Sequence, residues 1–104
     1  MPPTLRCIEA HWPAPAHVQA LCTTRTGGNS AAPYASLNLA QHVGDDSTTV
    51  DRNRRLLAAA LPEGTSVQWL SQVHGATVVQ ASPAGACPEA DACSAPQAGS
   101  ACAV

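Results

Sequence analysis

The residues best suited to chemistry in this sequence are its histidines and cysteines, which are scattered singly along the chain. They are His11, His17, His42 and His74, and Cys7, Cys22, Cys87, Cys93 and Cys102. Imidazole and thiolate are ligands that zinc prefers, but the usual combination of a C-x-x-C pair with a histidine pair does not occur here. A metal site must therefore combine distant parts of the fold, or use residues that the chain does not contain.

His74 lies in the segment Gln72-Val73-His74-Gly75, where the chain turns between two expected strands. A histidine at such a turn can bind a metal ion, or it can simply complete its hydrogen bonds at the end of a strand. Gly75 allows the backbone to approach a bound group. Gln72 can support a metal-bound imidazole, or it can face the solvent.

Arg25 and Asn38 are the candidates for binding a substrate. Arg25 precedes Gly27-Gly28, and the backbone N–H groups of a glycine-rich turn can form an anion-binding nest. The alternative is a surface arginine beside a hairpin turn. Asn38 can hydrogen-bond a ligand or orient a metal-binding loop, and a purely structural role is its alternative. His42 is typical of a packed histidine or of one that supports a metal ligand, and a role as a metal ligand is its alternative.

Composition and charge exclude several classes of protein. The formal net charge is −2 and the chain has no lysine, so we expect binding neither to nucleic acid nor to an anionic membrane. No apolar run approaches the roughly 18 residues of a transmembrane helix, and the N-terminus lacks the apolar segment of a secretory signal. We therefore expect a cytoplasmic protein whose five cysteines are reduced and mostly buried.

The material for a hydrophobic core is scarce. Leu, Ile and Val together number 17 of 104 residues, Phe is absent, and 21 residues are Ala. Alanine buries little apolar area, so a lone domain of this composition is marginally stable. Trp12 and Trp69 are expected to lie in this core.

One helix and several short strands must position the candidate residues, which predicts an α/β fold in a single domain. The helix is expected near 47–61. Strands are expected at 5–9, 18–24, 67–70 and 77–79, with strand edges at 90–93 and 101–104.

The expected helix has clear start and stop signals. An N-cap is expected within 44–47, a capping box from Thr48 and Asp51, and an end at Pro62. Asp45 and Asp46 are interpreted as residues of the helix start and not as a catalytic carboxylate pair. The positions that share one helical face include Val50, Asn53 and Leu57.

Six segments occur together in the order and spacing of one protein family. They are TRTGGNS (24–30), PYASLNL (33–39), HVGDD (42–46), NRRL (53–56), QWLSQVHG (68–75) and ADA (90–92). From about residue 12 to residue 104 the chain resembles the laccase-domain family. This bacterial group was first labelled multicopper polyphenol oxidoreductase, is also called peptidoglycan editing factor, and is now regarded as zinc-dependent purine nucleoside phosphorylases.

The resemblance implies a single mixed α/β domain of roughly twice this length, of which residues 1–104 are the N-terminal portion. It implies a zinc ion with three protein ligands, and the histidine of the family's Gln-Val-His-Gly motif corresponds to His74. The other ligands lie in a Thr-Ala-Asp-Cys and a His-Ala-Gly-Trp-Arg-Gly motif, which are absent here. Cys102 precedes the first of these motifs and is not its cysteine. We therefore expect a chain truncated before two of the three ligands.

The resemblance also implies an enzyme that is both a transferase and a hydrolase. It implies phosphorolysis of adenosine, inosine, guanosine or methylthioadenosine, and hydrolytic deamination of adenosine. His74 would then be the metal-binding and catalytic residue, Arg25 and Asn38 would bind substrate, and Gln72 and His42 would support the metal site. This chain by itself is expected to be catalytically incomplete.

Two alternatives of other classes remain open. The first is a copper-dependent polyphenol oxidoreductase, although the motifs do not resemble the His-Cys-Met set of a blue-copper site. The second is a non-catalytic fragment or binding module, which the scarce core favours. The residues do not distinguish the preferred nucleoside or the oligomeric state.

Overall fold

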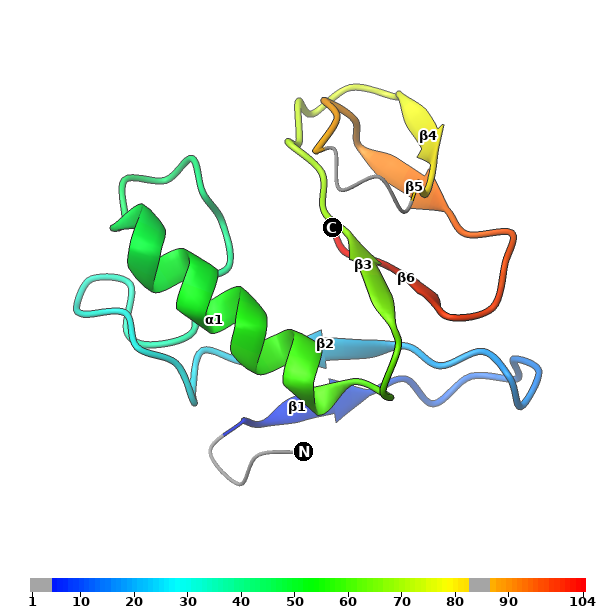
Figure 1. Cartoon of the computed structure of the whole chain (residues 1–104), viewed down its shortest axis with the longest axis horizontal. Helices are drawn as coiled ribbons and strands as arrows, with labels where there is room; N and C mark the ends of the chain where they lie inside the picture. Colours follow the sequence, from blue (N-terminus) through cyan, green and yellow to red (C-terminus); the bar gives the residue numbers. More distant parts are fainter. Residues whose placement is uncertain (1–4, 83–86) are drawn as a thin grey trace. The chain divides into compact units, whose positions relative to one another are not determined.

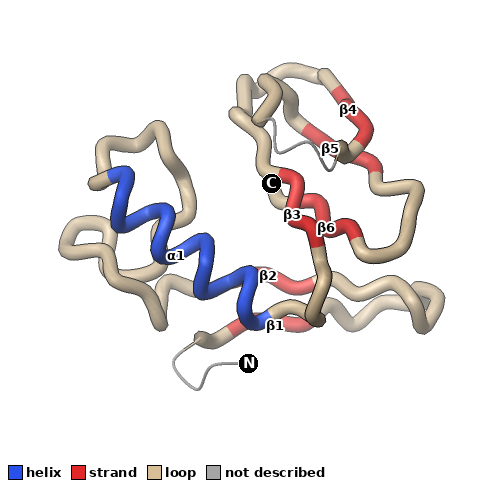
Figure 2. Tube along the Cα trace, viewed as in Figure 1, coloured by secondary structure: helices blue, strands red, loops and turns tan. Residues whose placement is uncertain are grey.

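The computed structural model describes residues 5–82 and 87–104 as a mixed α/β chain with one helix and short strands. The chain divides into two compact units, a first unit Met1–Leu61 and a second unit Pro62–Val104. Figure 1 labels the elements of both, and Figure 2 separates helix, strand and loop by colour. Within the described residues no helix is both long enough and apolar enough to cross a membrane.

The first unit begins with an antiparallel pair of strands, β1 (Cys7–Glu9) and β2 (Leu21–Thr23). Cys7 lies opposite Thr23, and the next residues along the two strands also face each other in register. The backbone bond from Thr24 N–H to the Arg6 carbonyl, at 3.1 Å, extends the pair by one step. Both strands were expected, but they are shorter than the expected 5–9 and 18–24.

The single helix α1 (Ser47–Ala60) follows a long loop, and it confirms the expected helix near 47–61. The Asp46 carboxylate caps it by accepting the Thr49 N–H at 3.1 Å and the Thr49 hydroxyl at 2.9 Å. The expected capping box of Thr48 and Asp51 is wrong, because the cap lies at Asp46 and Thr48 already belongs to the first helical turn. At the other end Pro62 has no N–H to continue the helix.

The core of the first unit is small and partly polar. Leu5, Leu37, Val50 and Leu57 are its buried apolar residues. Asn53 is fully buried with them, on the same helical face as Val50 and Leu57. The expected helical face is therefore confirmed, and one of its buried members is an amide.

The second unit contains two parallel strand pairs. The first pair joins β3 (Ser66–Gln68) to β6 (Ser100–Cys102), and the second joins β4 (Val78–Gln80) to β5 (Ala92–Ser94). The strands β5 and β6 also contact each other. Ala90 and Gln68 are the buried residues of the described part of this unit.

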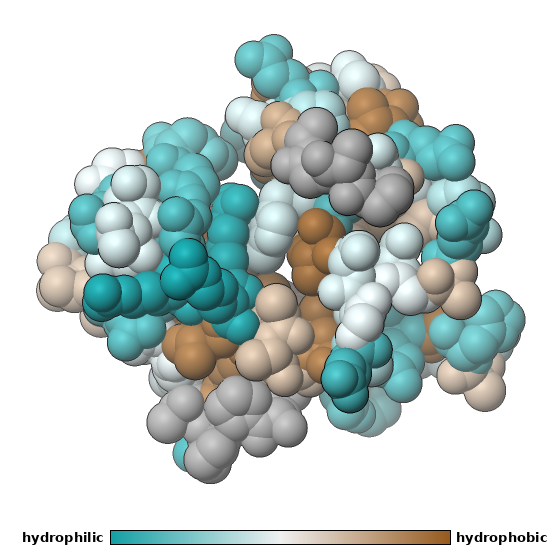
Figure 3. Space-filling view, in the orientation of Figure 1, coloured by the Kyte–Doolittle hydropathy of each residue, from teal (hydrophilic) through white to brown (hydrophobic). Residues whose placement is uncertain are grey.

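Two expectations about the core are wrong. Trp12 is 54% exposed, and Trp69 is only half-buried. None of the five cysteines is buried, and all five carry free thiols. Figure 3 shows hydrophobic residues at the surface among polar ones, and Ile8 and Val78 are more than half exposed. The strands are too short, and the core residues too few, to cover all the apolar side chains.

Candidate functional site

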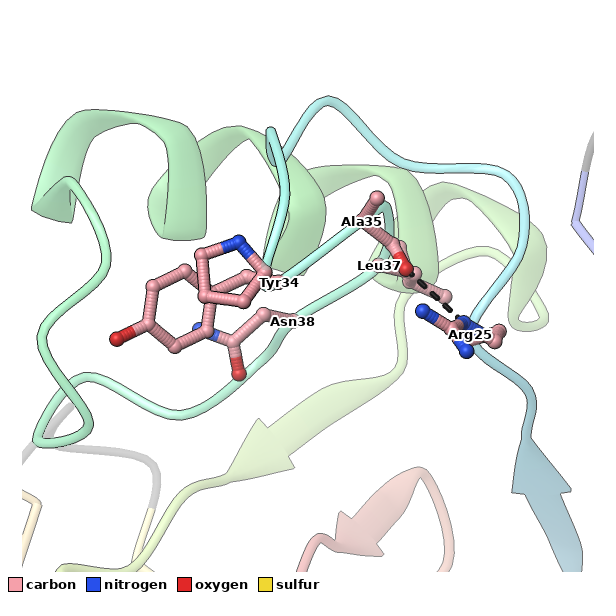
Figure 4. Close-up of a pocket in the computed structure, with 6 residues that line it drawn as sticks. Arg25, Tyr34, Ala35, Leu37 and Asn38 are labelled. Atoms are coloured by element: carbon pink, nitrogen blue, oxygen red, sulfur yellow. Dashed lines mark hydrogen bonds between the residues drawn. The ribbon is translucent and has the colours of Figure 1, made fainter.

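A depression of about 350 Å³ lies on the long loop of the first unit. Its lining consists of Arg25, Pro33, Tyr34, Ala35, Leu37 and Asn38. Figure 4 shows Tyr34 and Asn38 at one end of this depression and Arg25 at the other. The structure therefore brings together the two residues that were predicted to bind substrate.

Arg25 is held at the depression by bonds from its backbone and its side chain. Its carbonyl accepts the N–H groups of Ser36 and Leu37 at 2.7 and 2.9 Å. Its Nε–H donates to the Ala35 carbonyl at 3.1 Å, the bond drawn in Figure 4. Within the residues that the structure describes, no hydrogen bond engages the two Nη groups, so these remain for an anionic ligand.

The glycine-rich turn next to Arg25 does not form the expected anion nest. Its N–H groups donate inside the unit: Gly28 to the Ser36 hydroxyl at 3.1 Å, Asn29 to the Asn53 Oδ1 at 2.8 Å, and Ser30 to the Ser36 carbonyl at 2.8 Å. Because these three donors are occupied, they are not free for an anion, and anion binding by the guanidinium of Arg25 stays a prediction.

Asn38 uses its amide to shape the loop. Its Oδ1 accepts the Ala40 N–H at 3.1 Å, and its Nδ2 donates to the Ala40 carbonyl and to the Asp45 Oδ2, both at 3.2 Å. These bonds give Asn38 a structural role. Its part in substrate binding stays a prediction. To bind a substrate, the Asn38 amide would have to form a further hydrogen bond beside these or give up one of them.

Asn53 joins the helix to this loop. Its Nδ2 donates to the Ser30 hydroxyl at 2.9 Å and to the Asn38 carbonyl at 2.8 Å, while its Oδ1 accepts the Asn29 N–H at 2.8 Å. The sequence indicated only that Asn53 shares a face with apolar residues. A lone amide on such a face is the signal that could have identified this role, because a buried polar group must find partners.

Asp45 completes the network from the other side of the loop. Its Oδ2 accepts the Ser30 hydroxyl at 2.6 Å and its Oδ1 accepts the Asp46 N–H at 2.8 Å. The Ser30 bond is the main reason that the pKa of Asp45 is lowered; burial opposes it, and the Asn38 amide and Asp46 N–H add to it. Asp46 serves the helix start as expected, whereas Asp45 mainly fastens the loop.

His74 lies in the second unit on a tight turn with a left-handed backbone. Its φ angle is 58°, and its side chain is exposed. Left-handed backbone is unfavourable for residues other than glycine, so the surrounding bonds must hold it.

The Asp91 carboxylate holds this turn. Its Oδ1 accepts the Gly75 N–H at 2.8 Å and its Oδ2 accepts the Thr77 N–H at 3.3 Å. In return the Asp91 N–H donates to the Thr77 carbonyl at 2.9 Å. Burial alone would raise the pKa of Asp91, but the N–H donors of Gly75, Thr77, Val73 and His74 lower it overall. The sequence did not indicate this role, because its partners are backbone groups.

Gln72 and His42 are the two residues predicted to support the metal site. Gln72 is exposed on the same turn as His74, and His42 is exposed on the loop of the first unit. The expectation of a packed His42 is therefore wrong, and support of a metal site by either residue stays a prediction.

The described residues do not form a complete zinc centre. Among residues 5–82 and 87–104, no group of three His, Cys, Asp or Glu side chains is placed to hold a metal ion. A catalytic zinc takes three protein ligands and one open position. His74 is exposed, and its part in a metal site stays a prediction.

A family model described as multi-copper polyphenol oxidoreductase laccase matches residues 19–104. The chain therefore belongs to this laccase-like family. A purine nucleoside phosphorylase of Pseudomonas aeruginosa is 54% identical over 76 residues, which are 73% of this chain and 31% of that protein. A purine nucleoside phosphorylase of Haemophilus influenzae is 40% identical over 88 residues, covering 85% of this chain and 36% of the relative.

Solved structures show the same fold. A Neisseria meningitidis protein of the DUF152 family superposes with a TM-score of 0.86 and 44% identity, covering 94% of this chain and 40% of that one. YlmD from Geobacillus stearothermophilus gives a TM-score of 0.71 at 34% identity, covering 91% of this chain and 43% of YlmD. The chain spans about a third of the length of the curated relatives that it matches.

Proposed function

We propose that this chain is part of a purine nucleoside phosphorylase. Such an enzyme uses inorganic phosphate to cleave the bond between a purine and its ribose, releasing the purine base and ribose 1-phosphate. The observation that carries the proposal is the His74 turn, in which an exposed histidine has a left-handed backbone and Asp91 binds the next backbone N–H. Strained positions of this kind cluster at functional sites, and the similar curated proteins are named purine nucleoside phosphorylases.

We propose His74 as one ligand of a zinc ion. The two further ligands belong to the parts of the family that this chain does not span, in the Thr-Ala-Asp-Cys and His-Ala-Gly-Trp-Arg-Gly motifs. When bound, zinc supplies a Lewis acid and can activate water for the deamination of adenosine. The role of His74 itself is to hold one coordination position on a backbone that Asp91 keeps fixed.

We assign phosphate binding to Arg25. A guanidinium can donate two parallel hydrogen bonds to phosphate oxygens. The Nε–H bond to Ala35 fixes the side chain and leaves its Nη groups facing a depression. Asn38 lines the same depression and would contact the nucleoside or the phosphate there.

The test uses the protein encoded by the complete open reading frame that contains this sequence. We expect release of purine base from adenosine, inosine, guanosine and methylthioadenosine that depends on phosphate, together with zinc in the purified protein. His74→Ala should remove the zinc and lower kcat/KM by at least about a hundredfold. His17→Ala, which changes another exposed histidine, is the matched control and should behave as wild type.

Several outcomes would overturn the assignment. A His74→Ala protein with wild-type zinc content and activity removes His74 from the site. Base release without phosphate argues against a phosphorylase, and formation of inosine from adenosine tests the deaminase activity separately. An open reading frame that lacks both further ligand motifs overturns the three-ligand zinc site.

The second candidate is a copper-dependent polyphenol oxidoreductase, which the description of the matching family favours. Oxygen uptake with a phenol substrate would have to depend on copper and not on zinc. The same purified protein answers both questions when it is loaded with each metal in turn.

A further inference from the structure

Two thiols of the second unit touch each other across neighbouring strands. Cys93 lies in β5 and Cys102 lies at the end of β6. The Cys102 S–H donates to the Cys93 Sγ at a distance of 3.1 Å. A disulfide bond is about 2.05 Å long, so the two sulfur atoms would have to approach by only about 1 Å.

We propose that Cys93 and Cys102 are a modification site at which a peroxide forms an intramolecular disulfide. The Cys93 thiolate attacks one oxygen of hydrogen peroxide, which gives a sulfenic acid and, after protonation of the leaving hydroxide, a water molecule. The Cys102 sulfur then attacks the Cys93 Sγ and expels the sulfenic hydroxyl as a second water. Two thiols are oxidised, losing two protons and two electrons, and one peroxide is reduced to two waters.

The geometry assigns different parts to the two sulfur atoms. Cys93 accepts the S–H of Cys102, so the shared proton lies on Cys102. Burial, followed by the contact with Cys93, raises the pKa of the Cys102 thiol to about 11, so Cys102 stays protonated as the donor. Cys93 therefore reacts first and Cys102 closes the bond. Cys93 is half-buried and Cys102 is exposed, so a small oxidant reaches the pair.

Cys7 and Cys22 of the first unit form a natural contrast. They also lie on neighbouring strands, but Cys7 is opposite Thr23 and Cys22 is opposite Ile8. Adjacent residues of a strand point to opposite faces, so the side chains of Cys7 and Cys22 project from different faces of the pair. Neighbouring strands alone therefore do not create a disulfide site, whereas the sulfur contact in the second unit does.

The disulfide would link the two parallel strand pairs of the second unit. β5 belongs to the pair with β4, and β6 belongs to the pair with β3. The contact between β5 and β6 would then gain a covalent bond that closes the short connection 95–99. This pair is not part of a larger His, Cys, Asp or Glu cluster within the described residues.

The experiment treats the complete chain with hydrogen peroxide and identifies linked peptides by mass spectrometry, with and without a reductant. We expect one cross-linked species that joins Cys93 to Cys102 and lacks the mass of two hydrogen atoms. Cys7, Cys22 and Cys87 should remain available for alkylation. In Cys102→Ser, dimedone should trap a sulfenic acid at Cys93, and Cys22→Ser, the matched control, should cross-link as wild type.

The opposite results are equally clear. A cross-link that involves Cys87, or one distributed among all five cysteines, overturns the proposal. So does a wild-type chain in which Cys22 is oxidised while Cys93 and Cys102 remain thiols. Measurement on the unsubstituted chain keeps the test valid if a serine variant fails to fold.

Discussion

The two units use opposite kinds of side chain to fasten a loop. In the first unit the amide of Asn53 both donates and accepts, and it is fully buried beneath the loop. In the second unit the carboxylate of Asp91 only accepts, and it lies half-exposed beside the turn. An amide can satisfy carbonyl and N–H groups together, whereas an ionised carboxylate can only accept hydrogen bonds.

This difference affects what each loop presents. Asn53 binds both donors and acceptors of the loop, so these polar groups are paired inside the unit. The amide of Asn38 is also paired within the loop. The carboxylate of Asp91 takes only backbone N–H groups, so the side chain on the turn, His74, stays outside and available. We infer that the first unit fixes a binding surface and the second fixes a single chemical group.

The largest effect is expected from removing the buried amide. Asn53→Ala leaves the Asn29 N–H, the Ser30 hydroxyl and the Asn38 carbonyl without their partner. Unsatisfied buried groups each cost on the order of 1–3 kcal/mol, so the free energy of unfolding should fall by about 3 kcal/mol. Denaturant unfolding measures this change.

Arg52→Ala is the matched control, because Arg52 lies on the exposed side of the same helix. It should change the free energy of unfolding by less than about 0.5 kcal/mol. Equal stabilities of the two variants would show that the Asn53 network does not hold the loop.

A smaller loss is expected where the loop passes closest to the helix. A Cβ at Gly28 would overlap the Ser36 carbonyl oxygen and lie 2.7 Å from the Asn53 Oδ1. Gly28→Ala should therefore lower the free energy of unfolding by about 2 kcal/mol, the usual cost of overpacking.

Gly64→Ala in the second unit measures the cost of backbone strain where a side chain meets no steric overlap. Nothing lies within 4 Å of its Cβ position, but φ is +82°. We expect a cost of about 1 kcal/mol, from backbone conformation alone. If Gly28→Ala lowers the free energy of unfolding by no more than Gly64→Ala does, the close contact of Gly28 with Ser36 and Asn53 is contradicted.

The helix and its face could be predicted from the sequence because their causes are local. The cap at Asp46, the spacing of Val50, Asn53 and Leu57, and the stop at Pro62 each act on backbone within about one helical turn of themselves. The pairing of β3 with β6 could not be predicted, because residues 66–68 meet residues 100–102 only after the whole unit folds. Trp12 was misplaced because hydrophobicity alone does not tell which apolar residues a small core can cover.

The candidate site divides in the same way. His74 could be proposed as a candidate because it lies in a contiguous motif, which the family resemblance made specific. Asp91 was missed because its partners are N–H groups sixteen and fourteen residues away, and the identity of the side chains there carries no sign of them. A single sequence therefore gives little indication of hydrogen bonds between a side chain and backbone groups far away along the chain.

A local effect is expected from the carboxylate that holds the His74 turn. Asp91→Ala removes the acceptor of the Gly75 and Thr77 N–H groups, so their amide hydrogen exchange should accelerate by roughly tenfold or more. Asp91→Asn keeps one carbonyl acceptor, so the exchange rates in this variant should lie between those of wild type and of Asp91→Ala. Amide-resolved exchange by NMR measures this.

The matched control for this turn is Asp46→Ala, which removes another carboxylate that caps backbone N–H groups. It should accelerate exchange at Thr49 and leave Gly75 and Thr77 unchanged. In the protein from the complete open reading frame, Asp91→Ala should also lower zinc affinity by about tenfold. An unchanged exchange rate of the Gly75 amide in Asp91→Ala would contradict the conclusion that the Asp91 carboxylate stabilises the His74 turn.

The smallest effect is a pH dependence in the first unit. The pKa of Asp45 is lowered from the ordinary value of 3.8 for an aspartic acid, and the hydrogen bond from the Ser30 hydroxyl is the largest cause. A carboxyl group whose pKa is lower in the folded state stabilises the fold above its unfolded pKa. That contribution is lost as the pH falls through the lower, folded value, because the unfolded state then binds the proton first.

The difference in stability between wild type and Asp45→Asn should therefore be constant near neutral pH and shrink below about pH 4. Asn can still accept the Ser30 hydroxyl through its carbonyl oxygen, but its NH2 group cannot accept the Asp46 N–H, so the variant loses the titrating group and that one bond. Denaturation midpoints of both proteins measured from about pH 6 to about pH 2.5 give this difference directly. A difference that stays constant to the lowest pH would show that the Ser30–Asp45 bond does not depend on the charge of the carboxylate. The other hydrogen bonds of the network, such as those of Asn53 and Ser36, would then hold the loop without a charged partner.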